Sequence, residues 1–152
     1  MIIYHGSTVE VRQPVIRKER FNKDFYFGFY CTVIEKQAVR WATRFGNGIL
    51  NQYEYEPNNA LKMLSFNEMT EEWLDFIAAC RTGTPHHYDI VEGPMADDTI
   101  YNYVQGFIDG KYSRETFWSL ARFKHPTHQI SFHTEEALKT ITFIGAKEVY
   151  DE

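Results

Sequence analysis

The chain has 152 residues, of which 43% are hydrophobic and 16% aromatic, and it carries a net charge of -5 at neutral pH. This composition excludes a disordered or collagen-like chain, and the acidic balance argues against a general affinity for nucleic acid or anionic lipid. The length predicts one domain over residues 1–152. No apolar run approaches the roughly 20 residues of a membrane span, and no signal-peptide pattern opens the chain, so we expect a cytoplasmic protein without a membrane partner.

The apolar pattern predicts both strands and helices, with the middle third of the chain the more helical. Strands are expected at 2–5, 49–56, 61–66, 88–94, 128–134 and 143–151. Helices are expected at 35–45, 70–81, 97–110, 113–123 and 135–141. Because strands flank a helical middle third, we expect an α+β fold.

Three of the expected helices carry recognisable starts or faces. The first places Ala38, Trp41, Ala42 and Phe45 on one apolar face, with Thr32 as its N-cap. Thr70 is the expected N-cap of the second helix, and Ser113 begins a capping pattern ahead of the fourth.

Two short motifs and one aromatic residue carry the functional signal. Residues 4–7 read "YHGS", residues 28–32 read "GFYCT", and Trp41 follows Tyr30 by eleven positions. In this order and spacing they resemble the ADP-ribosyltransferase superfamily, in its diphtheria-toxin and poly(ADP-ribose)-polymerase branch. Nearly the whole chain also resembles a group of small bacterial members with the layout "YHGS … DFGxGFY … WLxFI … YDIVxGPxADD … NQIxFHT". It departs from that layout at Tyr26 and Phe27, where the pattern has glycine and a polar residue.

The resemblance implies a split antiparallel β core with a helical insert, NAD as co-substrate, and no metal. His5 would bind a ribose hydroxyl of the adenosine half. The backbone of Gly6 would pair with the nicotinamide amide, which glycine permits because it has no Cβ. Ser7 would donate to that amide or to a ribose oxygen. A strand ending in an ordinary turn is the alternative interpretation of these three residues.

Aromatic and basic side chains would complete the NAD site. Tyr30 would stack on the cationic nicotinamide ring, with Trp41 closing the other side; both would otherwise be core aromatics. Arg12 would reach the pyrophosphate, although a solvated loop is the alternative. The basic stretch 12–23 is also suited to a nucleic-acid acceptor.

The expected catalytic group comprises His5, Tyr30 and Gln129. Most superfamily members carry a glutamate on a late strand that holds a ribose 2′-hydroxyl and offsets the charge of an oxocarbenium-like transition state. The matching position here is Gln129, whose amide can hold the hydroxyl without adding charge. A different register would assign that role to Glu135 or Glu136, although their position at a helix N-terminus also explains them.

These features predict a mono-ADP-ribosyltransferase that modifies an intracellular protein or nucleic acid. By resemblance it would be the toxin of a bacterial toxin–antitoxin or phage-defence system, with an antitoxin protein as partner. An NAD glycohydrolase and a noncatalytic NAD- or ADP-ribose-binding module remain alternatives, as does an interaction domain that binds no nucleotide. The histidines lack an HExxH arrangement or cysteine partners, so we expect no zinc site.

Overall fold

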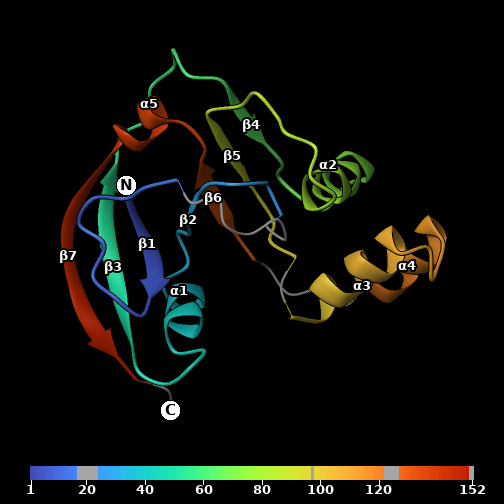
Figure 1. Ribbon diagram of the computed structural model, residues 1–152, viewed down its shortest axis with the longest axis horizontal. Coiled ribbons are helices and arrows are strands. Elements are labelled where there is room, and N and C mark those ends of the chain that lie inside the picture. The colour runs from blue at the N-terminus through green and yellow to red at the C-terminus, as the bar shows by residue number, and fades with distance from the viewer. Residues whose placement is uncertain (17–23, 97, 122–126, 151–152) are drawn as a thin grey trace.

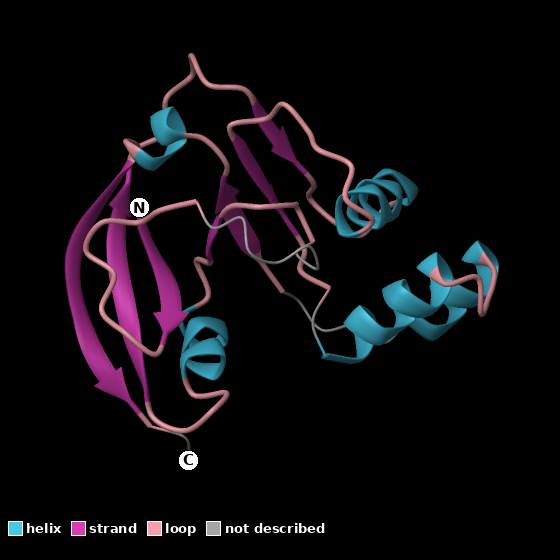
Figure 2. Cartoon of the chain, in the orientation of Figure 1, coloured by secondary structure: helices cyan, strands magenta, loops and turns pink. Residues whose placement is uncertain are grey.

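The computed structural model describes residues 1–16, 24–96, 98–121 and 127–150 (Figure 1). Within these residues the chain forms two sheets and five helices, so the α+β class expected from the sequence is confirmed. The helices α2 (Glu71–Arg81), α3 (Asp98–Ile108) and α4 (Arg114–Ala121) gather on the far side of the second sheet from the first (Figure 2). Among the described residues, no helix combines the length and apolarity needed to cross a membrane.

The strands divide into a three-stranded and a four-stranded sheet. The first has the order β1 (Ile2–Ser7), β3 (Gly48–Tyr55), β7 (Ile141–Val149), and all its pairs are antiparallel. The second has the order β2 (Phe29–Cys31), β6 (Gln129–Phe132), β5 (Ile90–Gly93), β4 (Met63–Ser65). Its pairs are antiparallel except β4 with β5.

The two sheets meet where β1 passes the end of β2. Tyr4 and Thr32 exchange two backbone hydrogen bonds of 2.8 and 2.9 Å across an antiparallel bridge. The bridge is isolated, because no further ladder joins β1 to β2. Cys31 pairs with Ile130, so the neighbouring residue Gln129 lies beside this bridge. The junction therefore brings together the segments that contain "YHGS", "GFYCT" and Gln129.

Side chains on opposite faces of β2 enter two different apolar cores. The first core lies between the sheets, and it includes Ile3, Phe29, Cys31, Tyr53, Ile130 and Phe132. The second lies under α2, α3 and α4, and it includes Phe25, Tyr30, Trp73, Val91, Val104 and Phe117. The period-2 alternation of a strand explains this division, since Phe29 and Tyr30 are consecutive.

Helix α1 (Glu35–Ala42) packs closely on β1 and β3 because glycines face it. A Cβ added at Gly6 would overlap the Ala38 carbonyl oxygen and lie 2.7 Å from Ala42 N. A Cβ added at Gly48 would lie 2.9 Å from Ala42 Cβ and closer still to its carbonyl group. Such contacts lie inside van der Waals separation, so the helix can approach only where these side chains are absent.

The sequence predicts the first residue of α1, Glu35, correctly, but its last residue and its N-cap wrongly. The helix stops at Ala42, and Phe45, which was expected on its buried face, is 86% exposed. The N-cap is Ile34, which makes no side-chain cap hydrogen bond, while the Thr32 hydroxyl accepts from Ile34 N at 3.0 Å. Thr32 is instead buried in the β1–β2 bridge, because strand pairing takes its backbone.

The other two expected helix starts are confirmed. Thr70 caps α2 by accepting from Trp73 N at 3.2 Å. Ser113 accepts from Thr116 N at 3.1 Å at the start of α4. Helix α5 (Glu135–Leu138) is shorter than the expected 135–141 and is capped by Thr134, which accepts from Ala137 N at 3.1 Å. Local capping chemistry thus fixes these starts.

We predict that Gly48→Ala destabilises the protein by about 1–3 kcal/mol, because the added methyl group forces α1 away from β3. Gly145→Ala is the matched control, since nothing lies within 4 Å of a Cβ at this position of β7. Urea unfolding of both variants measures the difference. Equal midpoints for the two would contradict the proposed close packing.

Candidate functional site

His5 joins β1 to β2 through its side chain. Its Nδ1 lies 2.6 Å from the backbone oxygen of Tyr30, and its ring centroid lies 4.3 Å from that of Phe29. A carbonyl oxygen can only accept, so Nδ1 carries the proton. In the neutral imidazole Nε2 is then a hydrogen-bond acceptor, which suits a hydroxyl donor.

The main chain of Gly6 is turned away from β3, to the side of β1 on which β2 lies. Backbone groups along an antiparallel strand point alternately to its two sides. Those of Tyr4 bond to Thr32, directly after β2, so those of Gly6, two residues on, point to the same side. The Tyr30 carbonyl, which would face Gly6 in a longer ladder, is held by His5 instead. Ser7 ends β1, and its Oγ accepts from Val9 N at 3.3 Å.

The Tyr30 ring is only 9% exposed and belongs to the second core. Its hydroxyl donates to the backbone oxygen of Tyr26 and accepts from Phe25 N at 3.1 Å. Burial first, and the charge of Asp24 second, raise the pKa of this phenol well above its ordinary value. The phenol is therefore neutral at physiological pH, and residues 25 and 26 lie across its hydroxyl end.

Two histidines fasten the segment 24–27 over Tyr30. His86 Nε2 lies 2.8 Å from the Phe25 carbonyl oxygen, and His133 Nδ1 lies 2.5 Å from the Phe27 carbonyl oxygen. The two imidazole centroids are 4.4 Å apart. Burial lowers the pKa of both histidines, that of His133 to about 4. Both are therefore neutral at pH 7, with the donor nitrogen of each directed at the segment.

Gln129 lies on the same face as Tyr30 and is 3% exposed. Its Nε2 donates to Asp24 Oδ2 at 3.2 Å. The other carboxylate oxygen of Asp24 accepts from Arg81 at 2.6 Å (Nη2) and 3.0 Å (Nε). Asp24 and Arg81 are both buried, so they form an internal ion pair to which Gln129 is attached.

The other sequence-predicted residues lie further from this group or at the surface. Trp41 is half-buried on α1. The Arg12 side chain is 70% exposed, pairs with Glu10 at 2.8 Å and lies over the Phe143 ring at 5.2 Å. These contacts match the solvated loop that was its alternative. Residues 17–23 of the basic stretch lie outside the described residues.

Sequence reasoning missed two polar groups near Gln129. One is the Asp24–Arg81 ion pair, whose members are 57 positions apart and carry no spacing signal. The other is His128, whose Nε2 lies 2.6 Å from Glu92 Oε2 while its Nδ1 accepts from Val33 N at 3.2 Å. Alternation places Glu92 and Ile130 on the face opposite Gln129, so this second pair lies on the other side of the sheet.

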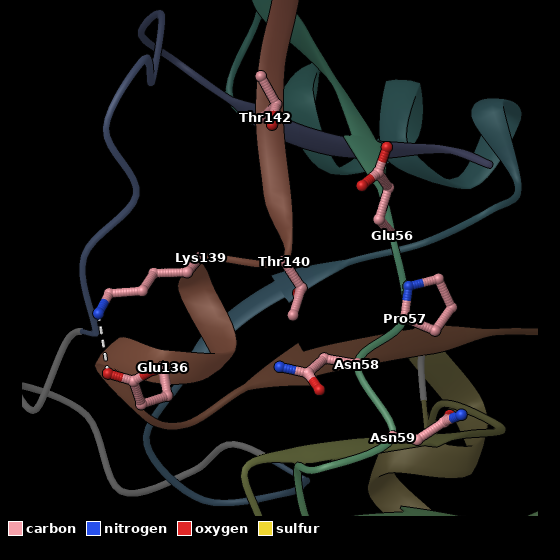
Figure 3. A pocket seen from close by; sticks show the side chains of 8 residues that line it. All are labelled: Glu56, Pro57, Asn58, Asn59, Glu136, Lys139, Thr140 and Thr142. Atoms are coloured by element: carbon pink, nitrogen blue, oxygen red, sulfur yellow. Dashed lines mark hydrogen bonds and ion pairs between the residues drawn. The ribbon is translucent and has the colours of Figure 1, made fainter.

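A polar pocket of 420 Å³ is formed by α5, the start of β7 and the segment 56–59 that follows β3 (Figure 3). Its lining consists of Glu56, Pro57, Asn58, Asn59, Glu136, Lys139, Thr140 and Thr142. Glu136, one of the two alternative carboxylates, pairs there with Lys139 at 2.8 Å. It comes from α5 and not from the strand that carries Gln129. No three potential metal ligands cluster among residues 1–16, 24–96, 98–121 and 127–150.

One protein-family model matches most of the chain. The family is described as a protein of unknown function (DUF3990), and the match covers residues 1–143. A search of curated proteins finds none that matches. The matched range includes the β1–β2 junction, the Asp24–Arg81 ion pair and Gln129.

Tyr26 has φ 77°, a left-handed conformation that favours glycine. We predict that Tyr26→Gly is more stable than Tyr26→Ala by about 1 kcal/mol, because both remove the ring and only alanine retains the backbone strain. Phe27→Gly and Phe27→Ala are the matched control pair, in which alanine should equal or exceed glycine in stability. Thermal unfolding of the four variants compares them, and a Tyr26→Ala protein as stable as Tyr26→Gly contradicts the strained conformation.

We predict that the free energy of unfolding falls as the pH drops from about 6.5 to 4. The unfolded chain binds a proton at an ordinary histidine pKa of 6.5, whereas folded His133 binds it only near pH 4. The loss should approach about 3 kcal/mol, and His86 adds to it in the same direction.

Urea unfolding across this pH range measures the effect in wild type and in His133→Gln, which should show a shallower slope. His87→Gln is the control, because His87 is the exposed neighbour of His86. Identical slopes for wild type and His133→Gln would refute the assignment.

Proposed function

Since the chain belongs to the DUF3990 family, whose description assigns no activity, we propose from its own geometry that it is a mono-ADP-ribosyltransferase that uses NAD. The observation that carries the proposal is the 2.6 Å contact from His5 Nδ1 to the Tyr30 carbonyl oxygen. It unites two motifs that are 25 positions apart and that together resemble the NAD-binding core of that superfamily. Gln129, the third expected residue, lies beside the same junction.

The polar groups at the junction match the parts of NAD that they would bind. A carboxamide offers one donor group and one acceptor, and the Gly6 main chain offers the complementary acceptor and donor. Those Gly6 groups are turned to the side of β1 on which β2 and the Tyr30 carbonyl lie. The Nε2 atom of His5, as an acceptor, suits a ribose hydroxyl. The fit supports a nicotinamide bound at the end of β1 with its ribose near His5.

The proposed chemistry breaks the bond between the nicotinamide nitrogen and ribose C1′. Nicotinamide leaves with the bonding electron pair, and a nucleophilic atom of the acceptor macromolecule bonds to C1′ and loses its proton to solvent. Gln129 would hold the ribose 2′-hydroxyl while positive charge develops at C1′. The amide contributes orientation and a dipole, but no net charge.

Stacking of nicotinamide on Tyr30 requires the segment 24–27 to move. The ring is buried, and its hydroxyl is bonded to Phe25 and Tyr26 of that segment. The contacts of His86 and His133 with the same segment would have to break. A ring exposed only on substrate binding would also limit hydrolysis of NAD by water in the resting protein. Transfer to a bacterial macromolecule, and neutralisation by an antitoxin protein, rest on the resemblance alone.

We predict that the purified protein releases nicotinamide from NAD and attaches labelled ADP-ribose to a macromolecule in cell extract. His5→Ala should lower the rate at least tenfold, because the link to the Tyr30 carbonyl and the ribose acceptor are both lost. His87→Ala, an exposed histidine, is the matched control and should keep the wild-type rate.

Each failure of this assay has a distinct meaning. Free ADP-ribose without a labelled macromolecule would identify an NAD glycohydrolase. A thermal shift with NAD but no released nicotinamide would identify a binding module. Absence of both a shift and a product would refute the proposed function.

A further inference from the structure

Buried hydrogen-bond donors surround the Asp24 carboxylate. Arg81 donates to Oδ1, and both Ala96 N (2.8 Å) and Gln129 Nε2 (3.2 Å) donate to Oδ2. Arg81 also donates to the Tyr101 carbonyl at 3.2 Å and lies over the Tyr101 ring at 4.0 Å. Packing and hydrogen bonds therefore hold the carboxylate in one position.

A carboxylate in that position dictates which way the Gln129 amide faces. An ionised carboxylate only accepts, so the atom of Gln129 nearest to Asp24 must be the NH₂ group. The amide oxygen Oε1 then points away from Asp24. We propose that Asp24 is a positioning residue, which holds the Gln129 amide with Oε1 directed to accept the ribose 2′-hydroxyl of NAD. The inference rests on the proposed function, because only that function supplies the hydroxyl.

The same geometry explains why an amide and not a carboxylate stands at position 129. Asp24 and Arg81 compensate each other, so the buried group as found has no net charge. A second carboxylate 3.2 Å from Asp24 would add an uncompensated buried charge and replace a hydrogen bond with repulsion. The pair of positions 24 and 129 therefore requires one carboxylate and one amide, and in this chain Asp24 supplies the carboxylate and Gln129 the amide.

A charge swap tests the pair. Gln129→Glu creates the repulsion, Asp24→Asn removes the carboxylate that orients the amide, and the double variant D24N/Q129E restores one carboxylate and one amide beside Arg81. Asp75→Asn is the matched control, because Asp75 is an exposed aspartate paired with Arg114 on the surface. The measurements are kcat and KM for nicotinamide release, together with urea unfolding of each protein.

We expect Q129E to lower kcat at least tenfold at pH 8, and the double variant to recover at least threefold over Q129E. The KM for NAD should change less than kcat, because the hydroxyl contact matters most as charge develops at C1′. D75N should retain the wild-type kcat. Unfolding should show the same order, with the double variant more stable than the sum of the single effects predicts.

A pH profile separates orientation from a general loss of structure. At pH 5.5 the carboxyl group introduced by Q129E can take up a proton and donate a hydrogen bond to Asp24. The ratio of the Q129E kcat to the wild-type kcat should therefore rise at least threefold from its value at pH 8. Burial raises the pKa of Tyr30 and that of Cys80, so these two neighbours do not titrate over this range. Burial lowers the pKa of His133 to about 4, so His133 stays neutral over this range. Any change of charge at His86, whose pKa is also lowered by burial, occurs in both proteins and cancels in the ratio.

The outcomes distinguish a failure of the positioning role of Asp24 from a failure of the proposed function. If the wild type releases nicotinamide and Q129E has the same kcat and pH profile, the positioning role of Asp24 is wrong. The proposed function then still stands. A double variant no better than Q129E overturns the positioning role as well. Wild type that releases no nicotinamide refutes the proposed function, and the role of Asp24 falls with it.

Discussion

The isolated bridge between Tyr4 and Thr32 is the constraint on which the rest of the structure depends. A longer ladder between β1 and β2 would bond Gly6 to Tyr30 and merge the two sheets. The chain stops the ladder after one pair, and the His5 side chain takes the Tyr30 carbonyl. The sheets therefore stay joined at one point and separate beyond it. Beyond that point the main-chain groups of Gly6 have no strand partner in β2, and in the proposed function NAD takes the place of that strand.

The face opposite the first core is organised by the buried pair of Asp24 and Arg81. Removing two charges from water is costly unless hydrogen bonds satisfy them, and here donors from β6 and from the chain after β5 meet the carboxylate. Arg81 brings in α2 and contacts Tyr101 of α3. The pair thereby fixes where these helices sit over Tyr30. A buried ion pair whose hydrogen bonds are satisfied contributes more to the specificity of the arrangement than to net stability.

The sequence predicted those features that depend on local chemistry and missed those that depend on distant contacts. Caps at Thr70 and Ser113, and strands such as Ile90–Gly93, follow from short patterns, and the structure confirms them. The end of α1 was predicted wrongly, because the apolar spacing continues to Phe45 whereas the helix ends at Ala42. The candidate site divides in the same way. The resemblance grouped His5, Tyr30 and Gln129, but nothing in the sequence indicated the Asp24–Arg81 ion pair. The burial of Tyr30 matches the core aromatic that was its alternative interpretation.

Tyr26 is one of the two residues that depart from the layout of the small bacterial members, and it belongs to the segment 24–27 that covers Tyr30. Its positive φ shows that the turn itself requires the backbone shape that glycine adopts freely, and the chain keeps this shape at a cost. A tyrosine there gains ring contacts with Phe27 and His86, at centroid distances of 4.5 and 6.3 Å. Its carbonyl also receives the Tyr30 hydroxyl. The segment and the aromatic ring beneath it thus form one hydrogen-bonded unit, so a ligand that reaches the face of Tyr30 must compete with contacts that the chain makes with itself.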